Sequence, residues 1–263
     1  MLHLNRRFSR IQIAIISALL CGVAVAGFWR ARQPLYRLRG PNLVFWAWER
    51  PEDLRFLNPK KDAVAFLSSS VELLPYGVNI HRRMQPLLLA DGTQLIAVVR
   101  IYSHLDAPAA LDSVQMDELL NTALAATAQP RVTALQIDFD ARSSERPFYS
   151  RFLFELRRRL GPSYPISITA LASWCIGDRW IHDLLVNEAV PMLFSLGKEE
   201  PIVRQYLSSH TSFLEPHCNG SVGLSTGEWS PNAIHRRTRV YVFSRDPWTR
   251  KSVESIRSRL NGY

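Results

Sequence analysis

Segments that resemble strands alternate with segments that resemble helices along most of this sequence, and this alternation restricts the fold more than any other feature. Apolar runs rich in β-formers predict eight strands, at residues 43–50, 62–70, 93–102, 132–140, 165–173, 188–196, 220–227 and 237–245. Helical patterns lie between or after them, at 51–57, 112–128, 148–161, 178–185, 200–210 and 249–260. Such alternation is typical of parallel βαβ units.

Eight strands within residues 43–263 predict an α/β fold, a (β/α)8 TIM-like barrel near the lower end of its size range. A doubly wound open sheet is the alternative, although no glycine-rich phosphate loop follows the first strand, as a dinucleotide-binding version would require. A hairpin is predicted around Pro75–Gly77, after the second strand, and the connection after the seventh strand makes a poor helix.

The N-terminal region reads as a targeting segment. A basic segment, residues 1–10, precedes an apolar stretch at 11–29, whose continuous apolar core is marginally long enough to cross a bilayer. Ala24-Val25-Ala26 offers a cleavage site, so both a cleaved signal peptide and a signal-anchor helix stay open. Residues 30–42 form a linker, and on either reading the barrel domain, 43–263, is exported.

The net charge of +9 comes mainly from this leader. Seven arginines precede the first acidic residue, Glu49, so residues 40–263 carry only +2. Binding to nucleic acid depends on many basic contacts to phosphates, and we therefore expect none.

Metal and nucleophile motifs are missing from the sequence. The seven histidines form no H-x-x-x-H or H-E-x-x-H pattern, and no serine lies in G-x-S-x-G, so neither a metal site nor a serine nucleophile is predicted, and no cofactor is expected. Cys175 and Cys218 are the only exported cysteines, too few for a disulfide framework. The strand assignment puts them at opposite ends of the barrel, so we predict that they are not bonded to each other.

The strand TALQIDFDAR, residues 133–142, ends in two carboxylates. Asp138 and Asp140 are two residues apart and therefore share one face, which we expect to be the lumen side at the barrel mouth. A carboxylate there needs water, a cation or a hydrogen-bond partner, and it can act as an acid, a base or an electrostatic stabiliser.

Two glutamates are candidates for a second mouth carboxylate. Glu228 follows the seventh strand, and Glu49 ends the first, pointing into the mouth if the Phe45 and Ala47 face is the inner one. Glu49 could instead cap the segment at Pro51, and Glu228 could be a solvated loop residue. Paired carboxylates about 5–5.5 Å apart would give retention in glycoside hydrolysis, and about 6.5–9.5 Å inversion.

Cations and aromatic rings also gather at predicted strand ends. Arg100 and Tyr102 end the third strand, and Arg142 follows the fourth, so either arginine could pair with the aspartates and lower their pKa. Tryptophans, which can stack against sugar rings or simply fill the core, lie near the mouth at Trp174, Trp180, Trp229 and Trp248.

Residues 135–142 resemble in part the strand-four signature of family 18 glycoside hydrolases, Asp-x-x-Asp-x-Asp-x-Glu. Asp138 and Asp140 match its second and third acids, whereas Leu135 and Arg142 replace the first acid and the catalytic glutamate. Chitinase activity is therefore not carried over.

A broader set of motifs runs in order from about residue 43 to 230: FWAWERPEDLRFL, VAFLSSSVELL, IAVVRIYS, LQIDFDARSSERPFYSRFL, ITALASWCIGDRWI and AVPMLFSLG. Together they resemble a bacterial exported family, domain of unknown function 3142, which is regarded as glycoside-hydrolase-like. The resemblance implies a barrel in the bacterial envelope, either anchored in the inner membrane and facing the periplasm or cleaved and periplasmic. It supplies no reaction.

Two functions follow as hypotheses. In the first, the barrel is a glycosidase acting on a polysaccharide or glycoconjugate, with Asp140 as acid/base, Asp138 orienting it, and Glu228 or Glu49 as the second carboxylate. In the second, it is a non-catalytic carbohydrate-binding or envelope-assembly barrel whose aspartates form ion pairs with Arg100 and Arg142.

Overall fold

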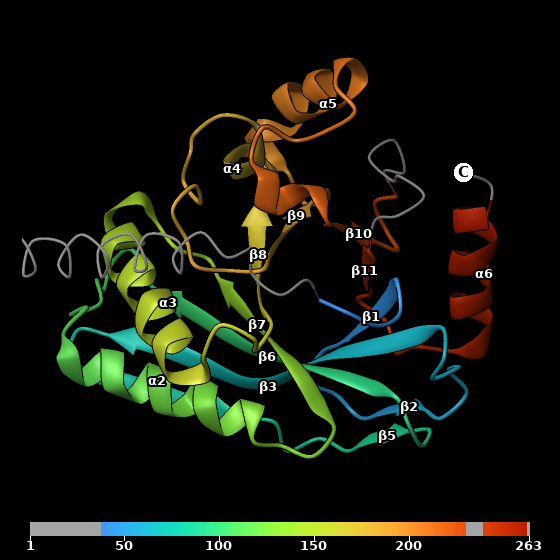
Figure 1. The fold of residues 1–263 in the computed structure, drawn as a ribbon, viewed down its shortest axis with the longest axis horizontal. Coiled ribbons are helices and arrows are strands. Elements are labelled where there is room, and N and C mark those ends of the chain that lie inside the picture. The colour runs from blue at the N-terminus through green and yellow to red at the C-terminus, as the bar shows by residue number, and fades with distance from the viewer. Residues whose placement is uncertain (1–37, 230–238, 262–263) are drawn as a thin grey trace, which may run out of the picture. The chain divides into compact units, whose positions relative to one another are not determined.

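Eight parallel strands close into a barrel in the computed structural model, which describes residues 38–229 and 239–261 (Figure 1). The strands are β1 (Leu43–Ala47), β3 (Asp62–Leu74), β6 (Gln94–Ser103), β7 (Val132–Phe139), β8 (Ile166–Leu171), β9 (Glu188–Met192), β10 (Ser221–Ser225) and β11 (Arg239–Phe243). They follow one another in chain order, and β1 closes the ring by pairing with both β3 and β11. The closed parallel barrel is thus confirmed, and the open sheet is wrong.

The predicted leader lies outside the described residues. All of the described residues belong to one compact unit of the chain, Tyr36–Tyr263. Within residues 38–229 and 239–261, no helix is both long and apolar enough to span a bilayer.

Five α-helices accompany the barrel in the described part of the chain, fewer than the eight of a complete (β/α)8 fold. They are α2 (Ser113–Thr127), α3 (Arg146–Leu160), α4 (Ala172–Ile176), α5 (Glu200–Ser209) and α6 (Arg250–Asn261). Helix α2 begins where the Asp112 carboxylate accepts a hydrogen bond from the Gln115 amide, as predicted for its N-terminus. It packs against β6, β7 and α3.

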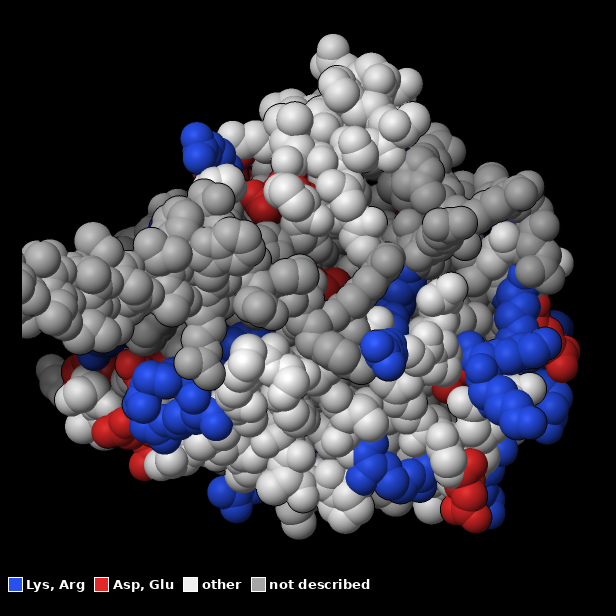
Figure 2. Space-filling view, viewed as in Figure 1, with Lys and Arg blue, Asp and Glu red and all other residues white. Residues whose placement is uncertain are grey.

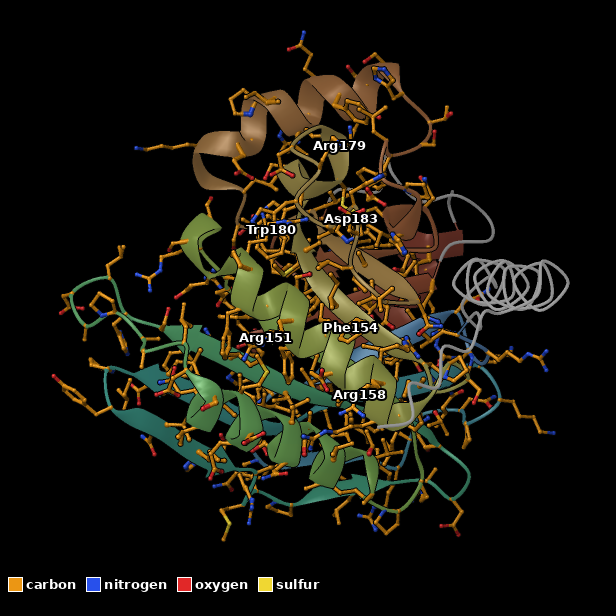
Figure 3. All side chains as sticks on the ribbon, turned by 60° about the vertical axis from the view of Figure 1, so that its left-hand side comes forward. Arg151, Phe154, Arg158, Arg179, Trp180 and Asp183 are labelled. Atoms are coloured by element: carbon orange, nitrogen blue, oxygen red, sulfur yellow. A yellow bond between two sulfur atoms is a disulfide. The ribbon has the colours of Figure 1, made fainter. Side chains whose placement is uncertain are left out.

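Helix α3 is amphipathic. Its inner face buries Tyr149 and Phe152, whereas Arg151, Phe154 and Arg158 are exposed on its outer face (Figure 3). The helix ends at Gly161, whose φ of 78° lies in the left-handed region that favours glycine.

Two predicted helices are wrong. Residues 52–54 form a strand, β2 (Glu52–Leu54), that pairs in parallel with β5 (Leu87–Leu89), because Glu52 and Leu54 are buried on one side while Asp53 is exposed on the other. The segment 178–185 forms turns, and the helix in this connection is α4, which starts directly after β8. The predicted hairpin is confirmed: β4 (Gly77–Arg82) pairs antiparallel with the extended end of β3.

Alternation along the strands separates the barrel interior from its outer face. Interior side chains form one apolar cluster: Leu38, Val44, Trp46, Ala63, Ala65, Leu67, Ile96, Val98, Ala134, Val190 and Tyr241. Phe45 and Ala47 belong instead to the larger cluster outside the barrel. The condition under which Glu49 would point into the mouth, an inward Phe45 and Ala47 face, is therefore not met, because the tryptophan face of β1 fills the lumen.

A chain of hydrogen bonds crosses the interior. The Trp46 Nε1 donates to Gln136 Oε1 at 2.9 Å, and the Gln136 amide donates to the Ser167 hydroxyl at 3.2 Å. Ser167 and the Tyr241 hydroxyl then both donate to Glu188 Oε1, at 3.2 and 2.8 Å. These bonds satisfy polar groups that would otherwise be costly in the core.

Cys175 and Cys218 form a disulfide, with their Cα atoms 5.9 Å apart, so the prediction that they stay unbonded is wrong. That prediction assigned each cysteine to the end of its nearest strand. Cys175 lies instead in α4, after β8, and Cys218 in a 3-10 turn before β10, Pro216–Asn219. Both segments pack near β9 on the outer side of the barrel, and both cysteines are fully buried there.

Candidate functional site

The carboxyl ends of the barrel strands bring the two predicted aspartates to the mouth. The register of β7 on β6 sets Asp138 opposite Arg100. Asp138 is 8% exposed, and its Oδ1 accepts a hydrogen bond of 2.6 Å from the Thr169 hydroxyl on β8. Asp140 is exposed, one step beyond the end of the strand.

Burial, and to a smaller extent the neighbouring charge of Asp140, raises the pKa of Asp138 to about 6. The Thr169 hydrogen bond and the positive charge of Arg100 act against this shift without cancelling it. Asp138 therefore exchanges its proton close to neutral pH, which is the property that acid-base chemistry requires of a carboxyl group.

Arg100 connects Asp140 to the aromatic residues of the mouth. Its Nη2 lies 3.3 Å from Asp140 Oδ2, with side-chain exposures of 34% and 53%. Its guanidinium carbon lies 5.3 Å from the Trp48 ring centroid and 5.4 Å from that of Tyr102. The predicted contact of Arg100 with an aspartate is thus present, in a solvent-accessible position.

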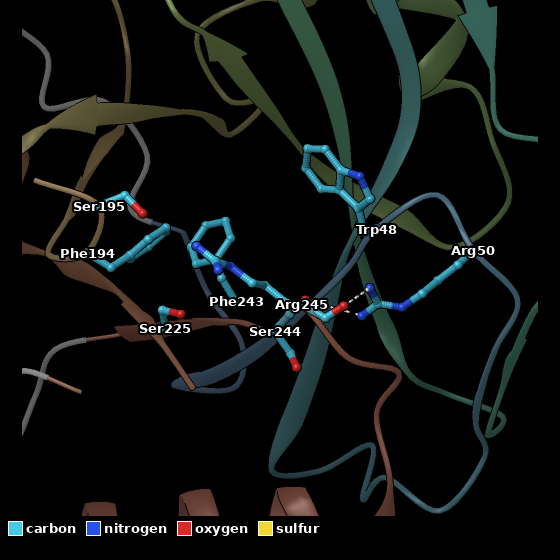
Figure 4. A pocket seen from close by; sticks show the side chains of 8 residues that line it. All are labelled: Trp48, Arg50, Phe194, Ser195, Ser225, Phe243, Ser244 and Arg245. Carbon is cyan, nitrogen blue, oxygen red and sulfur yellow. Dashed lines mark hydrogen bonds between the residues drawn. The ribbon is translucent and has the colours of Figure 1, made fainter. Parts of the chain in front are cut away.

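Two cavities open at the mouth. The smaller, about 130 Å³, is lined by Phe139, Asp140, Ala141, Thr169, Leu171, Trp174 and Met192. The larger, about 330 Å³, is lined by Trp48, Arg50, Phe194, Ser195, Ser225, Phe243, Ser244 and Arg245 (Figure 4). The first contains a candidate acid, and the second combines aromatic rings, hydroxyls and arginines.

The two predicted glutamates have different surroundings. Glu228 is exposed after β10, and its Oε2 accepts a hydrogen bond of 2.7 Å from the backbone amide of Ser195, which lines the larger cavity. Glu49 Oε1 instead lies 2.9 Å from His81 Nε2 on the hairpin strand β4. Of these two glutamates, Glu228 is consequently the one that lies at a mouth cavity.

Other predicted residues are engaged elsewhere. Arg142 pairs with Glu145 at 2.6 Å and donates to Ser103, so it does not pair with the aspartates. Trp229 is half-buried against the outer cluster, and the Arg259 guanidinium lies over its ring. Trp174 lines the smaller cavity, but its ring stacks on Trp180 at a centroid distance of 3.8 Å.

Thr169, Trp48, Phe194, Phe243 and Arg245 are among the mouth residues that the sequence analysis did not single out. Thr169 lies on the same face of β8 as Ser167, and the parallel pairing of consecutive strands places that face beside β7. The register between β7 and β8, which brings Thr169 next to Asp138, cannot be predicted from the local sequence. Trp48 continues the Trp46 face, which was the signal available for it.

Metal-ligating and charged side chains also lie away from the mouth. Among the described residues, no group of three or more His, Cys, Asp or Glu side chains is placed to hold a metal ion. On the face shown in Figure 2, Lys and Arg form separate groups, one of them over α6, interrupted by acidic residues.

The fold and the mouth define a class: a closed parallel barrel with a carboxylate-bearing cavity at the carboxyl ends of its strands. Residues 91–188 match the model of the family described as Domain of unknown function (DUF3142), which is the family that the ordered motifs resemble. The matched segment runs from the loop before β6 to the first residue of β9 and includes Asp138, Asp140 and Thr169. A comparison with curated proteins gives no match.

Proposed function

We propose that the protein is an exported, glycoside-hydrolase-like TIM barrel that cleaves a glycosidic bond in an envelope or extracellular polysaccharide or glycoconjugate. The observation that carries this proposal is the pair of adjacent carboxylates at the mouth, one buried with a pKa of about 6 and the other exposed in a cavity. Two carboxyl groups in different environments can divide the acid and base roles between them.

In this mechanism Asp140 is the acid/base that meets the glycosidic oxygen, because it is the aspartate that lines a cavity. Asp138 lies behind it, exchanges its proton near pH 6, and is itself positioned by Thr169. Glu228, fixed by the Ser195 amide, is the second carboxylate, and Glu49 is the less favoured alternative because His81 engages it.

The aromatic rings of the mouth suit a sugar ligand. Trp48, Phe194 and Phe243 line the larger cavity, and sugar rings stack their C–H faces on such side chains. Trp174 offers an apolar wall beside Asp140 in the smaller one.

Export to the bacterial envelope is supported by the leader sequence and by the disulfide. Disulfides form and persist mainly in oxidising compartments such as the periplasm. An uncleaved segment 11–29 would hold the barrel at the inner membrane, facing the periplasm.

A second candidate, a barrel that binds carbohydrate without cleaving it, is favoured by one observation. Arg100 pairs with Asp140, and an arginine in contact with a carboxylate competes with its use as a proton donor. In this case the mouth would recognise hydroxyl groups through the same side chains.

Replacement of Asp140 with asparagine separates the two candidates. The protein is incubated with envelope and extracellular polysaccharides, and new reducing ends are counted. We expect Asp140→Asn to lower the rate about 10²–10⁴-fold, while the free energy of unfolding changes by less than about 1 kcal/mol, because the pair with Arg100 is solvent-exposed.

Asp183→Asn serves as the control, because Asp183 is exposed on the outside of the barrel (Figure 3). A rate in Asp140→Asn equal to that of the control would exclude Asp140 as the acid/base. Glycan binding by the wild-type protein without any cleavage would establish the second candidate.

A further inference from the structure

The larger mouth cavity has an aromatic wall. Phe194 contacts Phe243 at a centroid distance of 4.9 Å, Phe243 contacts Trp46 at 4.8 Å, and Trp46 stacks on Trp48 at 4.9 Å. Three of these rings line the cavity itself, whose volume of about 330 Å³ is within the range of small-molecule sites.

The two arginines of this cavity differ in their partners. Arg50 is fully engaged: its Nε donates to the Glu52 carboxylate at 2.7 Å, and its terminal nitrogens donate to the carbonyls of Ser244, Arg245 and Asp246 at 3.2, 2.8 and 2.5 Å. Arg245 is exposed, and its guanidinium makes no hydrogen bond or ion pair with any residue in the described part of the chain. In Figure 4 its side chain points toward the Phe194 and Phe243 side of the cavity.

Arg50 therefore fixes the backbone from which Arg245 extends. The carbonyl groups of three consecutive residues, 244–246, accept hydrogen bonds from the Arg50 guanidinium. The backbone from which the Arg245 side chain extends is therefore held in place. A site whose backbone is already ordered loses less entropy when a ligand binds.

The cavity holds a cation among its lining residues. None of its described lining residues is acidic, although the Glu228 carboxylate lies at its edge, on the Ser195 amide. Arg245 contributes a guanidinium without a partner in the described part of the chain, and Ser195, Ser225 and Ser244 contribute hydroxyl groups. A guanidinium can bind a carboxylate through two parallel hydrogen bonds. One arginine balances a single negative charge, which suits a carboxylate better than a phosphate group near −2.

Trp48 links this cavity to the candidate acid. It lines the larger cavity and supports Arg100, which pairs with Asp140 in the smaller one. One glycan chain lying across the mouth would thus reach both cavities.

We infer that the larger cavity is a subsite for a sugar unit that carries a carboxylate, a uronic acid, and that Arg245 binds this carboxylate while the aromatic wall stacks on the sugar ring. This inference rests on the proposed function in that it takes the ligand to be a glycan. It narrows the substrate class to acidic polysaccharides.

The test compares matched acidic and neutral oligosaccharides. Tetrasaccharides of polygalacturonate, polymannuronate and hyaluronan are each paired with their carboxyl-reduced forms, which keep the linkages and lose the charge, and dissociation constants are measured by calorimetry. We expect the wild-type protein to bind at least one acidic form roughly 10- to 100-fold more tightly than its neutral counterpart, the range for hydrogen bonds to charged groups.

Arg245→Gln should abolish this preference by weakening the binding of the acidic form to about that of the neutral form. Arg151→Gln is the matched control, because Arg151 is an exposed arginine on the outer face of α3 (Figure 3) and should retain the full preference. Equal affinity for acidic and neutral forms in all three pairs, or an undiminished preference in Arg245→Gln, would overturn the inference.

Asp140→Asn distinguishes failure of this inference from failure of the proposed function. An acid preference that depends on Arg245, together with turnover unaffected by Asp140→Asn, would retain the subsite and reject the catalytic role of Asp140. Turnover of neutral glycans that depends on Asp140, with no preference for the acidic forms, would retain the catalytic role of Asp140 and reject the acidic subsite.

Discussion

Replacement of Asp138 with asparagine should stabilise the protein at neutral pH while removing glycan turnover. The pKa of Asp138 is about 6 in the folded barrel, against an ordinary value of 3.8. Each unit of pKa difference corresponds to about 1.4 kcal/mol, so ionised Asp138 costs the folded state about 3 kcal/mol at pH values above 6. Asparagine carries no charge and keeps an oxygen to accept the Thr169 hydrogen bond.

The direction of the pH dependence follows from proton binding. Between about pH 4 and 6 the folded state binds more protons at this position than the unfolded state, so the free energy of unfolding contributed by Asp138 falls as pH rises. The contribution is absent below the unfolded pKa, and the penalty is fully developed above the folded pKa. Asp138→Asn should remove this fall.

Urea denaturation followed by tryptophan fluorescence, repeated between pH 4 and 8, measures this effect. We expect Asp138→Asn to be about 1–3 kcal/mol more stable than the wild type at pH 7.5, since part of the gain is offset by the weaker hydrogen bond to a neutral acceptor. The two proteins should converge near pH 4, and Asp183→Asn should follow the wild type throughout. The reasoning would be refuted if Asp138→Asn were less stable than the wild type at pH 7.5, or if the difference in stability between the two proteins did not vary with pH.

Three other substitutions test separate parts of the structure. Thr169→Val removes the hydrogen bond that lowers the pKa of Asp138, so the pH-dependent decrease in the free energy of unfolding should occur at higher pH than in the wild type. An unchanged midpoint of this decrease would contradict the contact between Thr169 and Asp138. Replacing Cys175 and Cys218 together with serine opens a link spanning 43 residues and should cost about 4 kcal/mol in the same denaturation assay, with reductant affecting only the wild type. Trp46→Phe leaves the buried Gln136 Oε1 without its donor and should cost about 1–3 kcal/mol, and a neutral result would show that the interior network is dispensable.

The strands were predictable from the sequence because their signal is local. Each of the eight predicted segments overlaps a barrel strand, and β7 places Asp138 and Asp140 at a strand end as the alternation in TALQIDFDAR indicated. The start of α2 was predictable for the same reason, since its N-cap residue, Asp112, directly precedes the helix in the sequence.

Features that depend on how distant segments meet were not predictable. The Asp138 and Thr169 contact depends on the register between β7 and β8, and the disulfide depends on two connections meeting outside the barrel near β9. The segment that forms β2 was predicted as a helix because Pro51 resembles a helix start. Its strand conformation depends instead on pairing with β5, more than 30 residues away in the sequence. Arg142 was misassigned because its partner Glu145 lies on the turn after β7 rather than in the mouth.

The cost of Asp138 bears on the choice between the two candidate functions. An ion-pair account explains Asp140, because Arg100 contacts it in a position where such a pair contributes at most about 1 kcal/mol. It does not explain Asp138, whose burial raises its pKa and makes its ionised form unfavourable by about 3 kcal/mol at neutral pH. A neutral side chain of the same size would accept the Thr169 hydrogen bond without that penalty. Perturbed carboxyl groups beside a cavity are characteristic of sites where a proton is exchanged, and this supports the catalytic proposal over the purely structural one.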